Sequence, residues 1–228
     1  MRYKINGLVL SVLCFSLTLS SNIWSLPTPF CNGEKGNPHP NGGGFVSQNA
    51  TVSPAVLVGL KASVCGKAKV TGAVKLLENT VVKDHAVISG NAIISGNAII
   101  SGKARIQDNA FVFGEKTVSI SGEALISDEA QVIGNAKVSG KAIVSDFVTI
   151  SDQANISGNA IIEKDATINK SATIKGNALI SDRAVITDNA VVSGDAQIID
   201  QANISGESHV KGSAVISGDK TIEKGTIQ

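Results

Sequence analysis

Aromatic residues and prolines are scarce in this chain, and both absences limit what it can be. Phe, Trp and Tyr together make up 4% of the 228 residues, so few aromatic rings are available for stacking on a sugar. Four of the five prolines lie within residues 26–48. The net charge is +1, without the broad basic field that nucleic-acid binding requires, so we expect no nucleic-acid partner.

Long hydrophobic runs are also missing beyond the N-terminus. The segment from Leu8 to Leu19 is largely apolar, follows Arg2 and Lys4, and is followed by small residues such as Ser25. It is too short to span a membrane comfortably and has the layout of a secretory signal. We therefore predict a signal peptide at residues 1–25 and no transmembrane anchor after its removal. The expected destination is the periplasm, the cell surface or the medium of a bacterium.

Cysteine is rare as well, and only two cysteines would remain after export. Cys14 lies inside the apolar run, which leaves Cys31 and Cys65. An oxidising compartment allows these two thiols to pair, and the bridge would pin the N-terminal segment to the region around residue 65. Two unpaired thiols are the alternative. The Gly- and Pro-rich segment 26–48 is expected to be an irregular cap or linker.

The rest of the chain repeats a six-residue unit of the form A-x-[IV]-S-[GD]-x. From Ala86 to Asn109 it reads AVISGN AIISGN AIISGK ARIQDN, and the repeat continues with little interruption from Ala50 to Asp219. The small first and branched third side chains point the same way on a short strand, and Ser followed by Gly or Asp is typical of a tight turn. Each unit is therefore predicted to be a strand and a turn that share a core with their neighbours.

Three units make one coil, as the spacing of the turn residues shows. In the second half of the chain, glycine recurs at every eighteenth position: Gly140, Gly158, Gly176, Gly194 and Gly212. The other turn positions of the same period carry Asp and Lys as well as Gly. At about 4.8 Å per coil, some nine coils over residues 49–228 would form a triangular rod roughly 45 Å long. The repeat loses phase at residues 114–124, where we expect a one-residue bulge at a corner.

With these motifs the chain resembles the hexapeptide-repeat family over most of its length. The resemblance implies an all-β fold: a single-stranded, left-handed parallel β-helix with three hexapeptide units per 18-residue coil. The handedness follows from the resemblance, because the period does not show it, and an irregular right-handed β-helix is the alternative. An α-helical fold is disfavoured because β-branched residues dominate and glycine recurs throughout.

The resemblance also raises an enzymatic alternative, since many hexapeptide-repeat proteins are acyltransferases. Those enzymes commonly use a His near a subunit boundary as general base. His85, in KDHAVISG, is the candidate that matches best. The chain lacks the inserted loop and the C-terminal helical segment typical of such enzymes. The sequence therefore favours a non-catalytic protein, and we expect no cofactor.

One outward strand position carries an apolar stripe at eighteen-residue spacing, with Gln197 as its polar interruption. The stripe consists of the following residues: Leu125, Ile143, Ile161, Leu179 and Val215. The fold does not require such a stripe, and exposed apolar patches of this kind mark interfaces. We predict docking or self-association through this face; tolerated exposure of strand-forming residues is the alternative. The open C-terminal edge is a second place where copies could associate.

A turn column beside this stripe is acidic and is broken by Lys164. Its carboxylates belong to the following residues: Asp128, Asp146, Asp182 and Asp200. Ordinary turn chemistry explains aspartates at such positions. Weak calcium binding along the ridge is the alternative, because stacked carboxylates repel one another unless they accept hydrogen bonds or share a cation.

Together these features favour an exported, non-catalytic β-helical scaffold or binding protein that acts through its flat faces. Two alternatives stay open: an acyltransferase-like enzyme with a site at a trimer interface, and an adhesive or carbohydrate-binding array. The last would use exposed aromatic rings, for which Phe111, Phe113 and Phe147 are the candidates.

Overall fold

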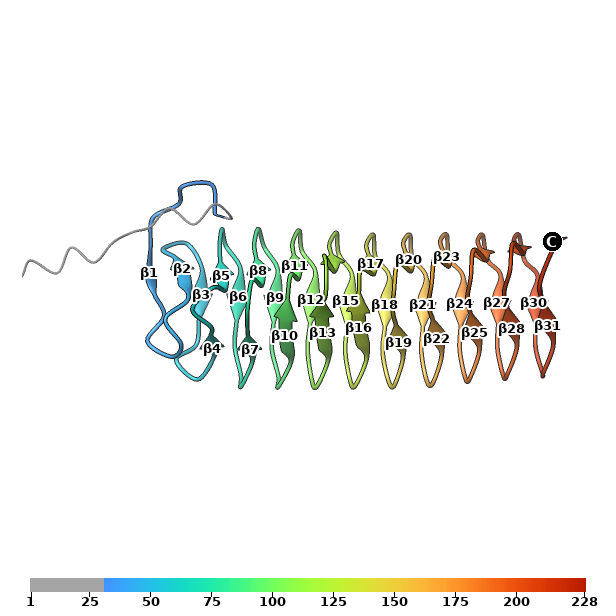
Figure 1. Cartoon of the computed structure of the whole chain (residues 1–228), viewed down its shortest axis with the longest axis horizontal. Coiled ribbons are helices and arrows are strands. Elements are labelled where there is room, and N and C mark those ends of the chain that lie inside the picture. The colour runs from blue at the N-terminus through green and yellow to red at the C-terminus, as the bar shows by residue number, and fades with distance from the viewer. Residues whose placement is uncertain (1–30) are drawn as a thin grey trace, which may run out of the picture.

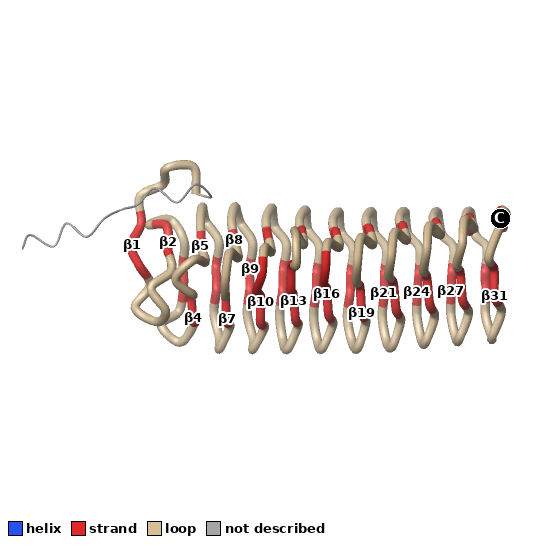
Figure 2. Tube along the Cα trace, viewed as in Figure 1, coloured by secondary structure: helices blue, strands red, loops and turns tan. Residues whose placement is uncertain are grey.

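The computed structural model describes residues 31–228, which form a rod of stacked coils with the C-terminus at one end (Figure 1). The predicted signal peptide, residues 1–25, lies outside the described residues. Each complete coil contributes one short strand to each of three sheets, and turns at the corners join them (Figure 2). Within each sheet the strands of successive coils run parallel. A strand in the middle of the rod therefore pairs with the equivalent strand of the coil before it and with that of the coil after it.

The three sheets are named A, B and C. Sheet A contains, in order, β1 (Gly36–Pro38), β2 (Phe45–Ser47), β5 (Ser63–Val64), β8 (Val81–Val82), β11 (Ile99–Ile100), β14 (Ser119–Ile120), β17 (Lys137–Val138), β20 (Asn155–Ile156), β23 (Thr173–Ile174), β26 (Val191–Val192), β29 (His209–Val210) and β32 (Thr226–Ile227). Sheet B contains β3 (Thr51–Val52), β6 (Lys69–Val70), β9 (Val87–Ile88), β12 (Arg105–Ile106), β15 (Leu125–Ile126), β18 (Ile143–Val144), β21 (Ile161–Ile162), β24 (Leu179–Ile180), β27 (Gln197–Ile198) and β30 (Val215–Ile216). Sheet C contains β4 (Leu57–Val58), β7 (Lys75–Leu76), β10 (Ile93–Gly96), β13 (Phe111–Gly114), β16 (Gln131–Gly134), β19 (Thr149–Ile150), β22 (Thr167–Ile168), β25 (Val185–Ile186), β28 (Asn203–Ile204) and β31 (Thr221–Ile222).

The core is a single column of small and branched aliphatic side chains. Ala142 and Val144 of one coil stack on Ala160 and Ile162 of the next, and all four are fully buried. The backbone closes the ladder between coils, as where the amide of Ile143 donates to the carbonyl of Ala160 at 2.9 Å. The all-β, parallel β-helical fold with 18-residue coils is thus confirmed. The ten-stranded sheets B and C give ten coils, close to the nine expected.

The turns at the corners of the rod differ in which residue types they accept. At the corner between sheets A and B, the backbones of successive glycines approach so closely that a Cβ on Gly158 would lie 2.6 Å from the carbonyl oxygen of Gly176. Gly158 also has a φ of +75°, where other residues are strained. At the corner between sheets B and C, Asp128 and Asp146 adopt φ values of 58° and 59°. Aspartate tolerates this conformation better than most residues with a side chain.

The N-terminal segment is more regular than the composition indicated. β1 pairs with β2 in antiparallel register, and β2 then pairs in parallel with β5, so this hairpin extends sheet A beyond the first complete coil. The turn of the hairpin is closed by the amide of His39, which donates to the carbonyl of Gly44 at 2.8 Å. Residues 31–228 contain no helix long and apolar enough to cross a membrane.

The expected one-residue bulge is wrong, because the interruption inserts two residues. Phe111 pairs with Gln131, twenty residues later, whereas Gln131 pairs with Thr149, eighteen residues later. The additional residues fall between Gly114 and Ser119, at the corner between sheets C and A. The register on either side is unchanged, so the array absorbs the insertion as an exposed ledge.

Candidate functional site

The apolar stripe lies in register on the outward surface of sheet B, here called face B. Leu125 pairs with Ile143, Ile143 with Ile161, and Ile161 with Leu179, so four consecutive coils present an aliphatic side chain at the same position. Ile143 and Ile161 are 37% and 38% exposed. Gln197 follows, and then Val215, which is 53% exposed. The structure thus brings together all of the predicted stripe residues.

Packing within the rod does not require this stripe. The alternating direction of strand side chains turns the second position of each unit outward, whatever residue stands there. At the coils of Leu125, Ile143 and Ile161, the equivalent positions of the other two sheets are polar: Gln131, Thr149 and Thr167 in sheet C, and Lys137, Asn155 and Thr173 in sheet A. Over these three coils, face B therefore differs chemically from the two other faces, whereas in the coil of Leu179 the equivalent positions are Val185 and Val191.

The predicted acidic column forms the corner that follows face B. Its carboxylates accept hydrogen bonds from backbone amides one coil further on: Asp128 Oδ2 from the amide of Asp146 at 3.3 Å, and Asp146 Oδ2 from Lys164 at 3.0 Å. Asp200 Oδ2 accepts in the same way from Gly218 at 2.9 Å. These carboxylates thus link successive turns, which is a structural role.

Lys164 interrupts the acidic column and pairs with its neighbour. Its ammonium lies 2.7 Å from Asp182 Oδ1. The hydrogen bond from Lys164, followed by the amide of Asp200, holds the pKa of Asp182 below the usual carboxyl range, and the same bond raises the pKa of Lys164. Within residues 31–228, no three His, Cys, Asp or Glu side chains are close enough together to hold a metal ion. Calcium binding along the acidic column therefore remains a hypothesis.

His85, the candidate general base, lies exposed at the corner between sheets A and B. Its amide donates to the carbonyl of Gly102 at 2.8 Å, but in the described part of the chain its imidazole makes no hydrogen bond. The neighbouring coils carry Lys67 and Lys103 in the same turn column. His209 lies in β29, several coils away. One copy of the chain therefore surrounds His85 with cations and does not orient its ring.

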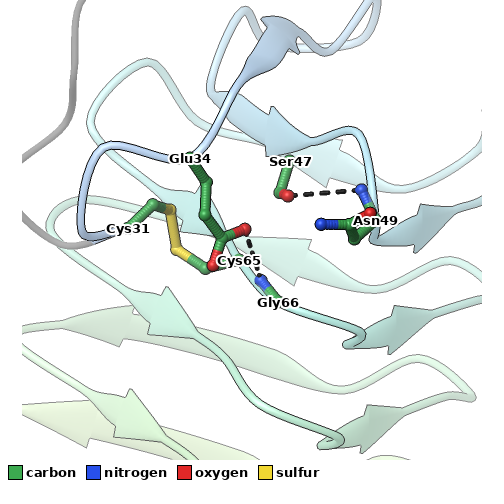
Figure 3. Close-up of a disulfide and its surroundings, with 6 residues drawn as sticks. All are labelled: Cys31, Glu34, Ser47, Asn49, Cys65 and Gly66. Carbon is green, nitrogen blue, oxygen red and sulfur yellow. Dashed lines mark hydrogen bonds between the residues drawn. A yellow bond between two sulfur atoms is a disulfide. The ribbon is translucent and has the colours of Figure 1, made fainter.

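A disulfide joins Cys31 to Cys65, as predicted (Figure 3). Both cysteines are 2% exposed and pack with Val81, against which the half-buried Phe45 also lies. Beside the bridge, Glu34 Oε2 accepts a hydrogen bond from the amide of Gly66 at 2.9 Å (Figure 3). The N-terminal segment is thus fastened to the second coil by one covalent and one charged contact.

A polar hollow of about 550 Å³ beside the two-residue insertion was not predicted. It is open to solvent and extends from the inserted residues before β14 across β17 and β20 to β23. Its lining is entirely polar: Lys116, Thr117, Asn135, Lys137, Gln153, Asn155, Ser171 and Thr173. The amide of Thr117 donates to Asn135 Oδ1 at 2.8 Å and fixes the ledge at one end. The sequence signal was the restart of the pattern at Val118 and Ile120, which reveals two extra residues.

The candidate aromatic residues are distributed unevenly. Phe111 and Phe113 are half-buried in β13, whereas Phe147 is 61% exposed at the corner between sheets B and C. Phe147 lines a second hollow, of about 350 Å³, together with Asp128, Glu129 and Asp146. None of these rings lines the polar hollow.

Comparison with known families supports the fold. The profile of a family described as the YdcK beta solenoid repeat matches residues 86–102, about one coil of the array. A comparison with curated proteins gives no match. The stacked parallel sheets and this local match together define a β-solenoid repeat protein.

Proposed function

We propose that this protein is an exported, non-catalytic β-solenoid scaffold that associates with a second copy of itself through face B. The observation that carries the proposal is the stripe from Leu125 to Leu179, which is aliphatic in four consecutive coils, in three of which the equivalent positions of the other two faces are polar. The Cys31–Cys65 bridge supports export, because structural disulfides persist in oxidising compartments.

The strength of this association follows from how much of the stripe is still exposed. Ile143 and Ile161 have already buried more than half of their surface against neighbouring side chains. Burying the remainder yields roughly 0.5–1 kcal/mol for each side chain. The stripe alone therefore supports a weak complex, and the whole width of face B has to contribute to a stable one.

The molar mass of the protein over a range of concentrations tests the proposal. Light scattering coupled to size exclusion should show a dimer at micromolar concentration. Ile143→Lys combined with Ile161→Lys should yield a monomer, because two ammonium groups would have to be desolvated in the interface. Thr149→Lys with Thr167→Lys places the same charges on sheet C and should leave the dimer intact. A monomeric native protein, or a stripe variant of unchanged mass, would contradict the proposal.

The same measurement addresses the enzymatic alternative. A closed trimer would place residues of two copies beside each other, as the acyltransferase interpretation requires. In that case the effect of His85→Ala on transfer from acyl donors becomes the decisive assay. A dimer through face B removes the reason to look for that chemistry.

Carbohydrate binding is a second candidate function, and the polar hollow is the observation that favours it. Hydroxyl and amide side chains recur there with the spacing of the coils, and Lys116 and Lys137 form no ion pair within the described residues. Such a lining suits an extended glycan that carries carboxylate or sulfate groups. Calorimetry with uronate-containing oligosaccharides tests this, with Gln153→Ala and Asn155→Ala expected to weaken binding. Heat that is unchanged in these variants would exclude the hollow as the site.

A further inference from the structure

We propose that the two copies pack face B against face B in antiparallel orientation, about a two-fold axis that passes between Ile143 and Ile161. The axis lies in the interface and is perpendicular to the rod, so the N-terminal end of one copy lies beside the C-terminal end of the other. This arrangement rests on the proposed self-association and specifies its partner geometry. It is inferred from how the residues of face B are distributed on either side of that axis.

The central column of face B is close to symmetric about the proposed axis. The axis places Ile143 against Ile161 of the second copy, and Leu125 against its Leu179. Two coils beyond Leu125 and Leu179, Val87 lies opposite Val215 of the second copy. Every aliphatic side chain of the column from β9 to β30 therefore meets another aliphatic side chain. The remaining members, Arg105 and Gln197, meet each other, so no apolar residue is placed against a charge.

The charges on the flanking columns are complementary under the same axis. On the side of the corner between sheets A and B, Lys103 of one copy lies opposite Asp195 of the other, and the symmetry repeats this contact. Asp195 is exposed, and within residues 31–228 its carboxylate accepts a hydrogen bond from Asn177 at 2.8 Å but pairs with no cation. Lys141 meets the neutral Asn159.

The column on the other side of face B also avoids conflict. Ser127 lies opposite Ser181, and Gln107 opposite Ile199. Glu163 is the one charged residue of this column in the overlapping coils, and it meets Ser145. No like charges face each other in any of the three columns of face B, over the eight coils from β9 to β30.

A parallel arrangement, with the two-fold axis along the rod, does not share this property. It places each residue of the central column against the same residue of the second copy. Two Arg105 side chains would then face each other, as would two Lys69 side chains, and like charges in contact are destabilising. Lys103 would lie opposite Gln107, and Asp195 would gain no cation. Electrostatics therefore select the antiparallel orientation.

The area of the overlap is sufficient for a specific but weak dimer. Eight coils at about 4.8 Å cover roughly 38 Å along the rod, and five residues of extended chain cover roughly 16 Å across it. The product is about 600 Å² for each copy, or about 1,200 Å² in total. This value lies at the lower limit of specific interfaces, so we expect dissociation in the micromolar range.

Zero-length carbodiimide cross-linking of the native chain distinguishes the two orientations. Within one copy Lys103 and Asp195 are separated by five coils, or about 24 Å, so a bond between them can only join two copies. Lys103 Nζ lies 3.1 Å from Glu123 Oε1 in the same copy, which supplies an internal control for the reaction. Mass spectrometry of the dimer band should identify the Lys103–Asp195 link, which should be absent from the monomer band.

Charge exchange provides the second readout. Asp195→Lys places two like charges opposite each other twice per dimer and should raise the dissociation constant about tenfold or more. Adding Lys103→Glu should restore it to within about threefold of the native value. Glu207→Lys makes the same charge change away from face B and should have no effect.

The outcomes separate the two proposals. A dimer that lacks the Lys103–Asp195 link and is insensitive to the charge exchange would overturn the antiparallel arrangement but leave self-association intact. A protein that is monomeric at all concentrations would overturn both. A dimer with the link, weakened by Asp195→Lys and restored by the double exchange, would establish the arrangement.

Discussion

Lys164 and Asp182 occupy the same turn position in consecutive coils, and the lysine ammonium lies 2.7 Å from the aspartate Oδ1. The pair stands in a column that is otherwise acidic on both sides of Lys164. Its lysine therefore relieves repulsion between Asp146 and Asp182 as well as forming an ion pair. Both groups are solvent-exposed, so we expect the ion pair to affect the pKa values of Lys164 and Asp182 more than the free energy of unfolding.

The first prediction concerns the pH dependence of this pair. Because the pKa of Asp182 is lowered in the folded protein, its ionised carboxylate contributes to the free energy of unfolding above about pH 4. This contribution to stability is lost as the pH falls through the lowered pKa. The raised pKa of Lys164 acts at the other end, where its contribution is lost as the pH rises through the raised value.

An NMR titration of the carboxyl carbons tests this with Lys164→Met. The pKa of Asp182 should rise towards the ordinary carboxyl value, because its largest stabilising contact is removed. Asp188, whose pKa is lowered by a separate lysine, Lys170, serves as the reference and should not change. An unchanged Asp182 titration would show that the amide of Asp200, and not Lys164, determines its pKa.

The second prediction separates backbone strain from steric contact at a glycine corner. Gly158→Ala introduces a Cβ at positive φ and also 2.6 Å from the carbonyl oxygen of Gly176. Gly218 has nearly the same φ, +76°, but a Cβ there would meet nothing within 4 Å. We expect Gly218→Ala to cost about 1 kcal/mol in free energy of unfolding and Gly158→Ala to cost clearly more, about 2–4 kcal/mol. Urea denaturation of both variants measures the difference, and equal costs would refute the role of the close approach.

The register of the sheets could be predicted from the sequence because the repeat has a strict period. An eighteen-residue spacing places Leu125, Ile143, Ile161 and Leu179 in one column whatever the details of the turns. The inward Ala and Ile positions follow from the alternation of a strand in the same way. The disulfide between Cys31 and Cys65 was predictable from the expected export and from the number of cysteines, without knowledge of the cap.

Features that depend on contacts between coils were not accessible in this way. The aspartates were expected at turns, but the acceptance of the next coil's amide by Asp128 and Asp146 depends on where each carboxylate lies relative to the coil above. The hairpin of β1 and β2 lies in a segment without periodicity. The polar hollow arises because two inserted residues form a ledge beside the next three coils, and the spacing of residues along the sequence does not show the shape of the surface that results.

The third prediction concerns how stability is distributed along the rod. Ile156 is fully buried in the middle of the array, with coils on both sides, whereas Ile227 is only partly buried in the last described coil. Ile156→Ala should cost about 2–5 kcal/mol, since it leaves a cavity between two coils, and Ile227→Ala should cost far less. Hydrogen exchange should show increased opening around Ile156 in the first variant. A similar loss of free energy of unfolding in both variants would mean that stability does not depend on the position of a coil along the rod.

The last prediction addresses the disulfide and the cap that it holds. Cys31 and Cys65 are separated by 34 residues, and closing a loop of that length restricts the unfolded chain by about 3–4 kcal/mol in the chain-entropy estimate. We therefore expect Cys31→Ser with Cys65→Ser to lower the free energy of unfolding by up to that amount. The effect should concentrate in the cap, because solenoid coils contact only their neighbours. Hydrogen exchange of β1 and β2 should accelerate strongly, while the amides of β20 and β21 remain protected.

Glu34→Gln, which keeps the bridge but weakens the contact with Gly66, should produce a smaller acceleration in the same segment. Equal acceleration in β1 and β20 would show that the bridge acts on the whole rod, and no acceleration would show that the hairpin holds the cap without it.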